Sequence, residues 1–169
     1  MRVRIRRPTP ADAPAFIAAV RRSRSLHHPW VSPPRTRKEF ARYLERAASE
    51  SHRCFLIVHR GTKEIVGVIN VNNLIRGAFQ NAFLGYYGFL PHAKRGLMYE
   101  GMRLVINYAF KKLKLHRLEA NIQPGNRASI ALVRKCGFVR EGFSRRYLKI
   151  AGRWRDHERW AILREGMGS

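Results

Sequence analysis

Residues 90–98 read Leu-Pro-His-Ala-Lys-Arg-Gly-Leu-Met, and this stretch decides the fold. It follows an apolar run typical of a strand and leads into a long segment whose apolar residues have helical spacing. Unpaired N–H groups at a helix N-terminus attract anions, and a glycine such as Gly96 lets a phosphate approach the main chain. The stretch therefore predicts a strand, an anion-binding loop and a helix, although a plain turn with solvated cations has the same composition.

A second stretch, residues 121–130, reads Asn-Ile-Gln-Pro-Gly-Asn-Arg-Ala-Ser-Ile and marks another strand-to-helix junction. Asn126 is suited to cap the helix that follows, and Gly137 is suited to end it. Both roles are structural, but a capping amide beside a strand end can also bind a ligand. The chain has no GxxxxGK[ST] or GxGxxG pattern, which argues against an ordinary nucleotide or dinucleotide loop.

Outward from these junctions, hydrophobic periodicity and turn residues predict the other elements. Strands are expected at residues 3–5, 54–59, 65–74, 82–90, 117–122, 138–150 and 154–163, and helices at about 10–24, 36–49, 96–113 and 126–135. The proline-rich residues 27–34 are expected to form a broken connection. The order β-α-α-β-β-β-α-β-α-β-β, without an internal repeat, indicates one mixed α/β (α+β) layer structure.

The charge of the chain is its unusual feature, because 34 Lys and Arg outnumber 11 Asp and Glu and give a formal net charge of +23. This field favours polyanionic partners such as rRNA, the ribosome or a ligand with phosphates, although solvated arginines also raise solubility. A length of 169 residues predicts a single domain, 1–169. No membrane segment, signal peptide or zinc-site spacing of Cys54 and Cys136 is found, so we expect a cytoplasmic protein without metal.

The two stretches together resemble the cofactor signature of GNAT acetyltransferases, most closely the RimJ/RimL branch, which acetylates N-terminal amines of ribosomal proteins. The likeness covers essentially the whole chain and rests on residues 94–100, 116–117, 120–121, 124, 126, 132–142, 147–148 and 152–157. It implies a mixed, mostly antiparallel sheet flanked by helices, with the fourth and fifth strands splayed apart. It also implies acetyl-CoA as cosubstrate, with its pantetheine arm in the gap and its pyrophosphate on the loop after the fourth strand.

The resemblance also implies which residues hold the cosubstrate. Phe89 and Leu90 would offer main-chain groups to pantetheine. The pyrophosphate would be held by Lys94, Arg95, Gly96, Leu97, Met98 and Tyr99, and the far side would be lined by Asn126 and Ser129. Many relatives have glycine or alanine at the position of Met98, so its side chain is expected to point into the helix-packing face.

The acid and base of the reaction are harder to find in the sequence. Val133 stands where many GNAT enzymes have a tyrosine that protonates the leaving thiolate, and Phe83 and Leu84 replace a frequent strand carboxylate. Tyr147 and Asp156 are the catalytic candidates, because the C-terminal strands flank the acceptor channel in relatives. The competing interpretations are an amphipathic strand residue and an ion-pair partner.

The expected function is acetyl transfer by direct attack on a protein N-terminal amine, with a ribosomal protein as acceptor. An α-amine, with a pKa of about 7.7 to 8.0, needs a weaker base than lysine, with a pKa of about 10.4. The loop His27 to Pro34 is expected to border the acceptor site. Two alternatives stay open: acetylation of a small amine or aminoglycoside, and a non-catalytic protein that binds RNA or the ribosome.

Overall fold

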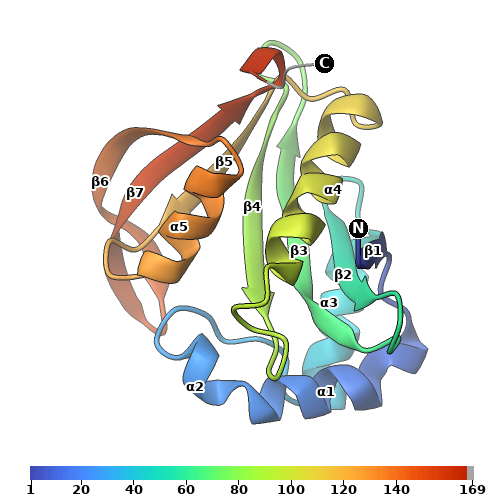
Figure 1. Ribbon diagram of the computed structural model, residues 1–169. Coiled ribbons are helices and arrows are strands. Elements are labelled where there is room, and N and C mark those ends of the chain that lie inside the picture. Colours follow the sequence, from blue (N-terminus) through green and yellow to red (C-terminus); the bar gives the residue numbers. More distant parts are fainter. Residues whose placement is uncertain (167–169) are drawn as a thin grey trace.

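A computed structural model describes residues 1–166 as a seven-stranded sheet with helices on both faces (Figure 1). The strands are β1 (Val3–Arg6), β2 (Arg53–His59), β3 (Ile65–Ile75), β4 (Asn81–Gly88), β5 (Arg117–Ile122), β6 (Val139–Ile150) and β7 (Arg153–Leu163). The helices are α1 (Ala13–Arg22), α2 (Arg24–His27), α3 (Arg37–Ala48), α4 (Leu97–Lys111) and α5 (Arg127–Lys135), with short 3₁₀ turns at Pro10–Asp12 and Arg164–Gly166. The last three residues of the expected domain, 167–169, lie outside the described residues.

The strand order is β1-β2-β3-β4-β5-β7-β6, and β4–β5 is the parallel pair among antiparallel neighbours. This pair is short: residues 81–83 of β4 match residues 117–119 of β5, whereas β4 continues to Gly88. Beyond Phe83 the two strands separate, and α5 and the β6–β7 hairpin diverge from the rest of the sheet (Figure 1). The mixed, mostly antiparallel sheet and the splayed fourth and fifth strands are therefore confirmed.

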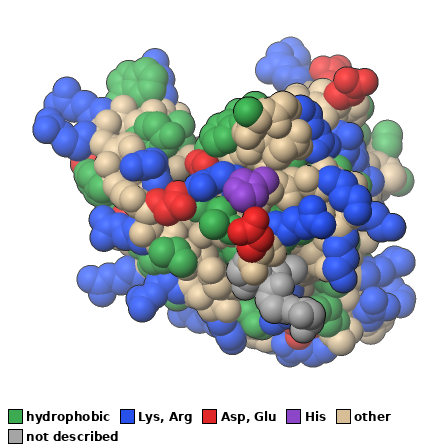
Figure 2. Space-filling view, turned by 90° about the horizontal axis from the view of Figure 1, so that it is seen from above, with side chains coloured by type: hydrophobic (Ala, Val, Ile, Leu, Met, Phe, Trp, Pro, Cys, Tyr) green, Lys and Arg blue, Asp and Glu red, His purple; other side chains and the backbone are tan. Residues whose placement is uncertain are grey.

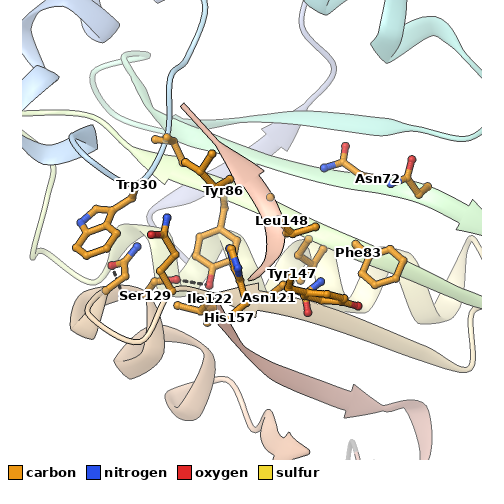
Figure 3. Close-up of a pocket in the computed structure, with 17 residues that line it drawn as sticks. Trp30, Asn72, Phe83, Tyr86, Asn121, Ile122, Ser129, Tyr147, Leu148 and His157 are labelled. Carbon is orange, nitrogen blue, oxygen red and sulfur yellow. Dashed lines mark hydrogen bonds between the residues drawn. The ribbon is translucent and has the colours of Figure 1, made fainter. Parts of the chain in front are cut away.

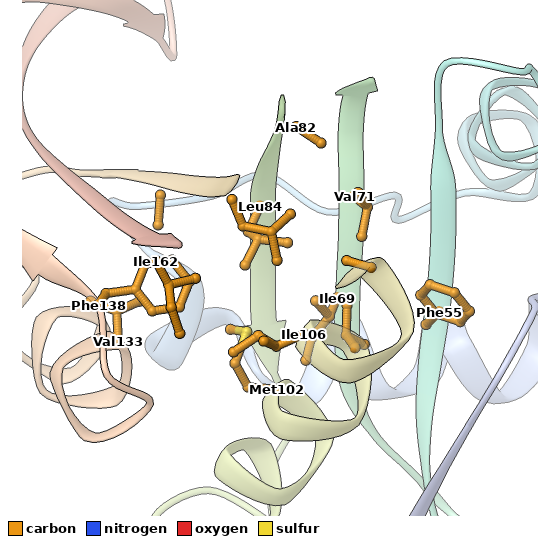
Figure 4. Close-up of a cluster of buried hydrophobic side chains, with 14 of the residues drawn as sticks. Phe55, Ile69, Val71, Ala82, Leu84, Met102, Ile106, Val133, Phe138 and Ile162 are labelled. Atoms are coloured by element: carbon orange, nitrogen blue, oxygen red, sulfur yellow. The ribbon is translucent and has the colours of Figure 1, made fainter. Parts of the chain in front are cut away.

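Side chains alternate between the two faces of the sheet along each strand, so the buried apolar residues form two layers, one on each face. Phe55 and Ile57 of β2 pack in a cluster with α4, α5 and β7, and this larger core is drawn in Figure 4. Leu56 and Val58 point to the opposite face, where they pack with α1 and α3. The helices thus cover both faces of β2 and β3, and the gap beside β4 stays open between the two layers.

Local capping explains where several of the helices begin. The Thr36 hydroxyl accepts a hydrogen bond from the N–H of Glu39 at 3.2 Å, and the Asn126 carbonyl oxygen accepts one from the N–H of Ser129 at 3.2 Å. Each bond satisfies a first-turn donor that the helix itself leaves unpaired. Gly96 precedes α4 with φ 77°, a left-handed conformation that suits glycine.

Two boundaries differ from the sequence-based expectation. The connection at residues 27–34 begins later than expected, because α2 occupies Arg24–His27. Strand β4 ends at Gly88, so Phe89 and Leu90 lie beyond it. Among residues 1–166, no helix has the length and apolar character needed to cross a membrane.

Candidate active site

The open edge of β4 presents main-chain groups to the gap. The N–H of Phe89 donates to the carbonyl oxygen of Val66 at 2.8 Å, in register with the β3–β4 pairing. Hydrogen-bonding directions alternate along an antiparallel strand. The main-chain groups of Tyr86 and Gly88 therefore point the other way, into the gap where the parallel pairing with β5 has ended.

This geometry corrects the expectation for Phe89 and Leu90, whose main-chain groups are already paired within the chain. The Phe89 carbonyl accepts from the N–H of His92 at 2.9 Å. The Leu90 N–H donates to the Ser23 hydroxyl at 2.9 Å, and its carbonyl accepts from Arg22 Nε at 2.7 Å. Because these bonds fold the chain back toward α1, the main-chain groups that face the gap are those of Tyr86 and Gly88.

A buried histidine holds the end of β4 in place. His27 Nε2 lies 2.7 Å from the carbonyl oxygen of Gly88, and since a carbonyl only accepts, Nε2 is the donor. Burial lowers the pKa of His27, opposed by the bond to Gly88. A neutral imidazole therefore anchors Gly88 from α2.

A cleft of about 400 Å³ runs from this strand edge to the start of α4 and includes most of the predicted cosubstrate residues. Its lining includes Lys94, Gly96, Leu97, Met98 and Tyr99 from the loop and α4, Asn126 and Ser129 from α5, and Tyr86 and Gly88 from β4. Lys94 has φ 62° and Gly96 has φ 77°, and such a turn aims successive N–H groups at the cleft. Arg95 is exposed beside it.

Two contacts shape this loop beyond what the sequence indicated. Arg2 pairs with Glu100 at 2.7 Å and donates to the Arg95 carbonyl at 3.0 Å, so the carboxylate in the first turn of α4 is neutralised. The Met98 side chain lies over Gly67 and Gly88, where a Cβ at Gly67 would meet its sulfur at 2.4 Å. The expected inward orientation of Met98 is confirmed.

The far wall of the cleft is tied to β4. The hydroxyls of Tyr86 and Ser129 lie 2.6 Å apart, as Figure 3 shows, and burial raises the pKa of the Tyr86 phenol. Because the Asn126 carbonyl oxygen caps α5, its NH₂ group is left to donate elsewhere.

A second pocket of about 420 Å³ adjoins the cleft and lies between β3, β4, β5 and the β6–β7 hairpin (Figure 3). The two cavities share five lining residues: Trp30, Val31, Tyr86, Asn126 and Ser129. Trp30 packs on Gly125, where an added Cβ would lie 3.1 Å from the indole ring. The loop after α2 thus borders the second pocket.

The structure separates the two catalytic candidates. Tyr147 lines the second pocket, in an irregular part of β6 where the register shifts between Ser144 and Leu148. Asp156 is exposed, and its carboxylate accepts from the N–H of Arg146 at 2.8 Å. Side chains alternate along β7, so Asp156 faces away from the pocket and does not support the expected catalytic role.

His157, the next residue, is the side chain that β7 turns into the pocket. It is 3% exposed, and its ring lies 6.3 Å from that of Tyr147 in an edge-on arrangement. Asn121, from β5, lines the same pocket. The motif Asp156-His157 indicated the right position along the strand, but which of the two neighbours faces inward depends on the pairing of β7 with β5.

The thiols and Val133 support an active site without a covalent protein intermediate. Val133 is fully buried in the larger core, so it fills space there. Burial raises the pKa of Cys136 to about 11, which disfavours the thiolate needed for nucleophilic attack. Burial likewise raises the pKa of Cys54, which lies in the core between the sheet and α3.

A third cavity, of about 620 Å³, continues from Trp30 and Val31 to the surface. Arg24, Arg35 and Arg155 are on its lining, and none of the residues that line it or the second pocket is Asp or Glu. Lys and Arg side chains are also spread over the face at the other end of the sheet, as Figure 2 shows. The entrance beside Trp30 is therefore positive.

The sequence and the fold match known proteins. The family described as "Acetyltransferase (GNAT) domain" matches residues 2–139, and the chain belongs to this family. A probable N-acetyltransferase of Bacillus subtilis, YjcK, is 41% identical over 127 residues, which cover 75% of this chain and 70% of that protein. The Escherichia coli ribosomal protein uS5-alanine N-acetyltransferase is 41% identical over 95 residues, 56% of this chain and 49% of that enzyme.

Solved structures agree with this assignment. The structure of Mycobacterium smegmatis RimJ in complex with CoA-disulfide superposes with a TM-score of 0.89 and 26% identity, covering 99% of this chain and 84% of RimJ. Spermidine N-acetyltransferase from Vibrio cholerae, in complex with CoA and spermine, has a TM-score of 0.82 at 20% identity, which shows the shared fold alone.

Proposed function

We propose that this chain transfers the acetyl group of acetyl-CoA to the N-terminal amine of a protein, with a ribosomal protein as the acceptor. The observation that carries the proposal is the junction of the two cavities at Tyr86, Asn126 and Ser129. A thioester held in the cleft and an amine in the second pocket would meet at this junction. The similarity to the uS5-alanine enzyme and to RimJ supports a protein acceptor.

The residues of the cleft fit acetyl-CoA. The loop from Lys94 to Gly96 offers main-chain donors, two cations and the N-terminus of α4 to a pyrophosphate. The main-chain groups of Tyr86 and the N–H of Gly88, which lie where β4 is no longer paired with β5, can pair with the amides of pantetheine as a strand would. The Asn126 NH₂ group can donate to a ligand carbonyl from the other wall.

The reaction would be a direct transfer. The amine nitrogen attacks the thioester carbonyl, the C–N bond forms, the C–S bond breaks, and the thiol leaves with a proton. Holding both reactants at the junction supplies a large part of the rate, because well-oriented groups react as if at very high concentration. Tyr147 lines the acceptor side and stays a candidate donor of that proton.

The charge of the entrance favours a peptide over a polyamine. Spermidine and aminoglycosides carry several positive charges and bind best where carboxylates line the site. Here the entrance is lined by Arg24, Arg35 and Arg155. The linings of the second pocket and of the third cavity contain no Asp or Glu. A peptide whose first residues are uncharged presents a single amine, so it meets less of this repulsion than a polyamine does.

The excess of cations also fits contact with rRNA near a ribosomal acceptor, in the cytoplasm. The net charge of +23 would attract the phosphate backbone without sequence preference.

The test is acetylation of a panel of acceptors followed by mass spectrometry. Peptides copied from ribosomal-protein N-termini should be acetylated at the α-amine, whereas the same peptides with a blocked N-terminus and an internal lysine should not. Spermidine and an aminoglycoside serve as the competing acceptors. Faster transfer to either of them than to every peptide would overturn the proposal.

A further inference from the structure

The tautomer of His157 is set by its own strand. Nδ1 lies 2.9 Å from the carbonyl oxygen of Arg155, and since a carbonyl can only accept, Nδ1 carries the proton. The other ring nitrogen, Nε2, therefore holds a free lone pair in the neutral imidazole. Because the His157 residue is 3% exposed and lines the second pocket, this lone pair faces the pocket and not bulk water.

A second polar group in the same pocket lacks a partner. The side-chain oxygen of Asn121 is buried and has no hydrogen-bond partner among residues 1–166. Asn121 pairs with Arg159 across β5 and β7, so it lies on the same face of the sheet as His157, one step along the ladder. A buried carbonyl oxygen without a donor is costly, which indicates a donor that arrives with the substrate. An amine nitrogen is such a donor.

We propose that His157 Nε2 accepts the proton of the attacking amine, and that the Asn121 side-chain oxygen orients that amine by accepting a second N–H. The inference rests on the proposed acetyl transfer and assigns its base. As the C–N bond forms and the C–S bond breaks, the proton passes from the amine nitrogen to Nε2 and reaches the departing sulfur through solvent or Tyr147. No proton is gained or lost overall.

The surroundings of His157 suit this exchange. Tyr147 from β6 packs against the ring, with the centroids 6.3 Å apart. Asn72 from β3 and Asn121 from β5 are neutral, and Arg155 and Arg159 stand two positions before and after His157 on β7. None of the residues lining this pocket is Asp or Glu.

An imidazole also matches one acceptor class better than another. Imidazole and an α-amine lose their protons at similar pH, whereas lysine does so about two to three pH units above an α-amine. Proton transfer is most effective between groups whose pKa values lie close together. A histidine base therefore favours the α-amine of a peptide over a lysine side chain.

The test uses His157→Asn, because the asparagine NH₂ can replace Nδ1–H at the Arg155 carbonyl while the base is removed. We expect kcat/KM for the acceptor to fall about a hundredfold, with unchanged acetyl-CoA affinity by calorimetry. The part of the pH dependence that comes from the enzyme, and not from the acceptor amine, should disappear in this variant. Added imidazole should restore part of the rate.

Asn121→Ala should mainly raise the KM of the amine. His116→Asn, an exposed histidine at the start of β5, is the matched control.

The outcomes separate the two proposals. Wild-type enzyme that acetylates no peptide, polyamine or aminoglycoside would overturn the proposed function and this inference together. Active wild-type enzyme with a His157→Asn variant of equal kcat/KM and the same pH profile would overturn the assignment of the base alone. A slower variant that keeps the wild-type pH profile and is not rescued by imidazole would show that His157 only supports the fold, and would overturn it too.

Discussion

The hydroxyl groups of Tyr86 and Ser129 lie 2.6 Å apart and join β4 to α5 across the gap where β4 and β5 have separated. Both side chains line the cleft and the second pocket. The bond therefore ties the two sides of the gap together where β4 and β5 are no longer paired, at the junction of the two cavities.

Removing either hydroxyl should weaken the fold and the site together. Tyr86→Phe is expected to cost about 1 kcal/mol of unfolding free energy, the usual net value of one hydrogen bond. Ser129→Ala should cost a similar amount, and the double variant should be less destabilised than the sum by about 1 kcal/mol. Denaturant unfolding of the four proteins measures this coupling. Additive effects would mean that the two hydroxyls do not interact in solution.

The Asn126 amide is expected to have two separable roles. Asn126→Asp keeps an oxygen that can cap α5 but removes the NH₂ group, so stability should be retained while acetyl-CoA affinity falls several-fold. Asn126→Ala should lose affinity and also about 1 kcal/mol of stability. Thr36→Ala, which removes the corresponding cap of α3 away from the cleft, is the control and should lose stability alone. Calorimetry and thermal melts distinguish the three. Full acetyl-CoA affinity in Asn126→Asp would leave only the structural role.

The loop before α4 should bind phosphate through its main chain more than through its charges. Arg95→Ala removes one exposed cation and should weaken acetyl-CoA binding only a few-fold, with the difference lost at high salt. Gly96→Pro cannot adopt φ 77°, so it should weaken binding at least tenfold at any salt concentration. Circular dichroism checks that both variants fold. Equal affinity of wild type and Gly96→Pro by calorimetry would contradict a pyrophosphate site on this loop.

The anchor at Gly88 should make stability depend on pH. Burial lowers the pKa of His27 in the folded chain below the ordinary value of about 6.5. Below about pH 6.5 the unfolded chain binds a proton at His27 that the folded chain does not bind. The contribution of His27 to the free energy of unfolding is therefore complete above about pH 6.5 and falls as the pH drops toward the folded pKa. His27→Gln can still donate to the Gly88 carbonyl and does not titrate. The melting temperature of wild type should therefore drop more than that of His27→Gln between pH 7.5 and pH 5. Parallel drops would show that His27 does not titrate differently on folding.

Much of the architecture followed from local signals in the sequence. The caps at Thr36 and Asn126, the left-handed glycine before α4 and the alternating apolar residues of β2 each act within a few residues, so their effect can be read from the chain. Together with the resemblance to one family, they were sufficient for the element order and for most residues of the cleft.

The errors arose where long-range contacts decide the outcome. Phe89 and Leu90 look like strand residues, but the bond of the Phe89 carbonyl to His92 and that of the Leu90 N–H to Ser23 end the strand at Gly88. Whether Asp156 or His157 faces the pocket depends on how β7 pairs with β5, where Asn121 lies opposite Arg159, and no local pattern encodes this pairing. The face of a strand reverses with a shift of one residue, so these positions need the paired strand to be known.

The charge of the entrance beside Trp30 can be reversed without changing the junction of the two cavities, where we propose that the reaction occurs. Arg24 and Arg155 are exposed on the lining of the third cavity, so Arg24→Glu with Arg155→Glu should be tolerated by the fold. Two carboxylates at this entrance would attract a polyamine, and we expect kcat/KM for spermidine to rise about tenfold at low ionic strength.

The matched control is Lys111→Glu with Lys112→Glu, exposed residues at the far end of α4. It lowers the net charge by the same amount but should leave acceptor preference unchanged. Because the effect acts through water, it should shrink as salt approaches 0.5 M, where screening is within about 4 to 5 Å. A tenfold gain that appeared in both variants would be due to overall charge, whereas no gain in either would show that the arginines at the entrance do not select the acceptor.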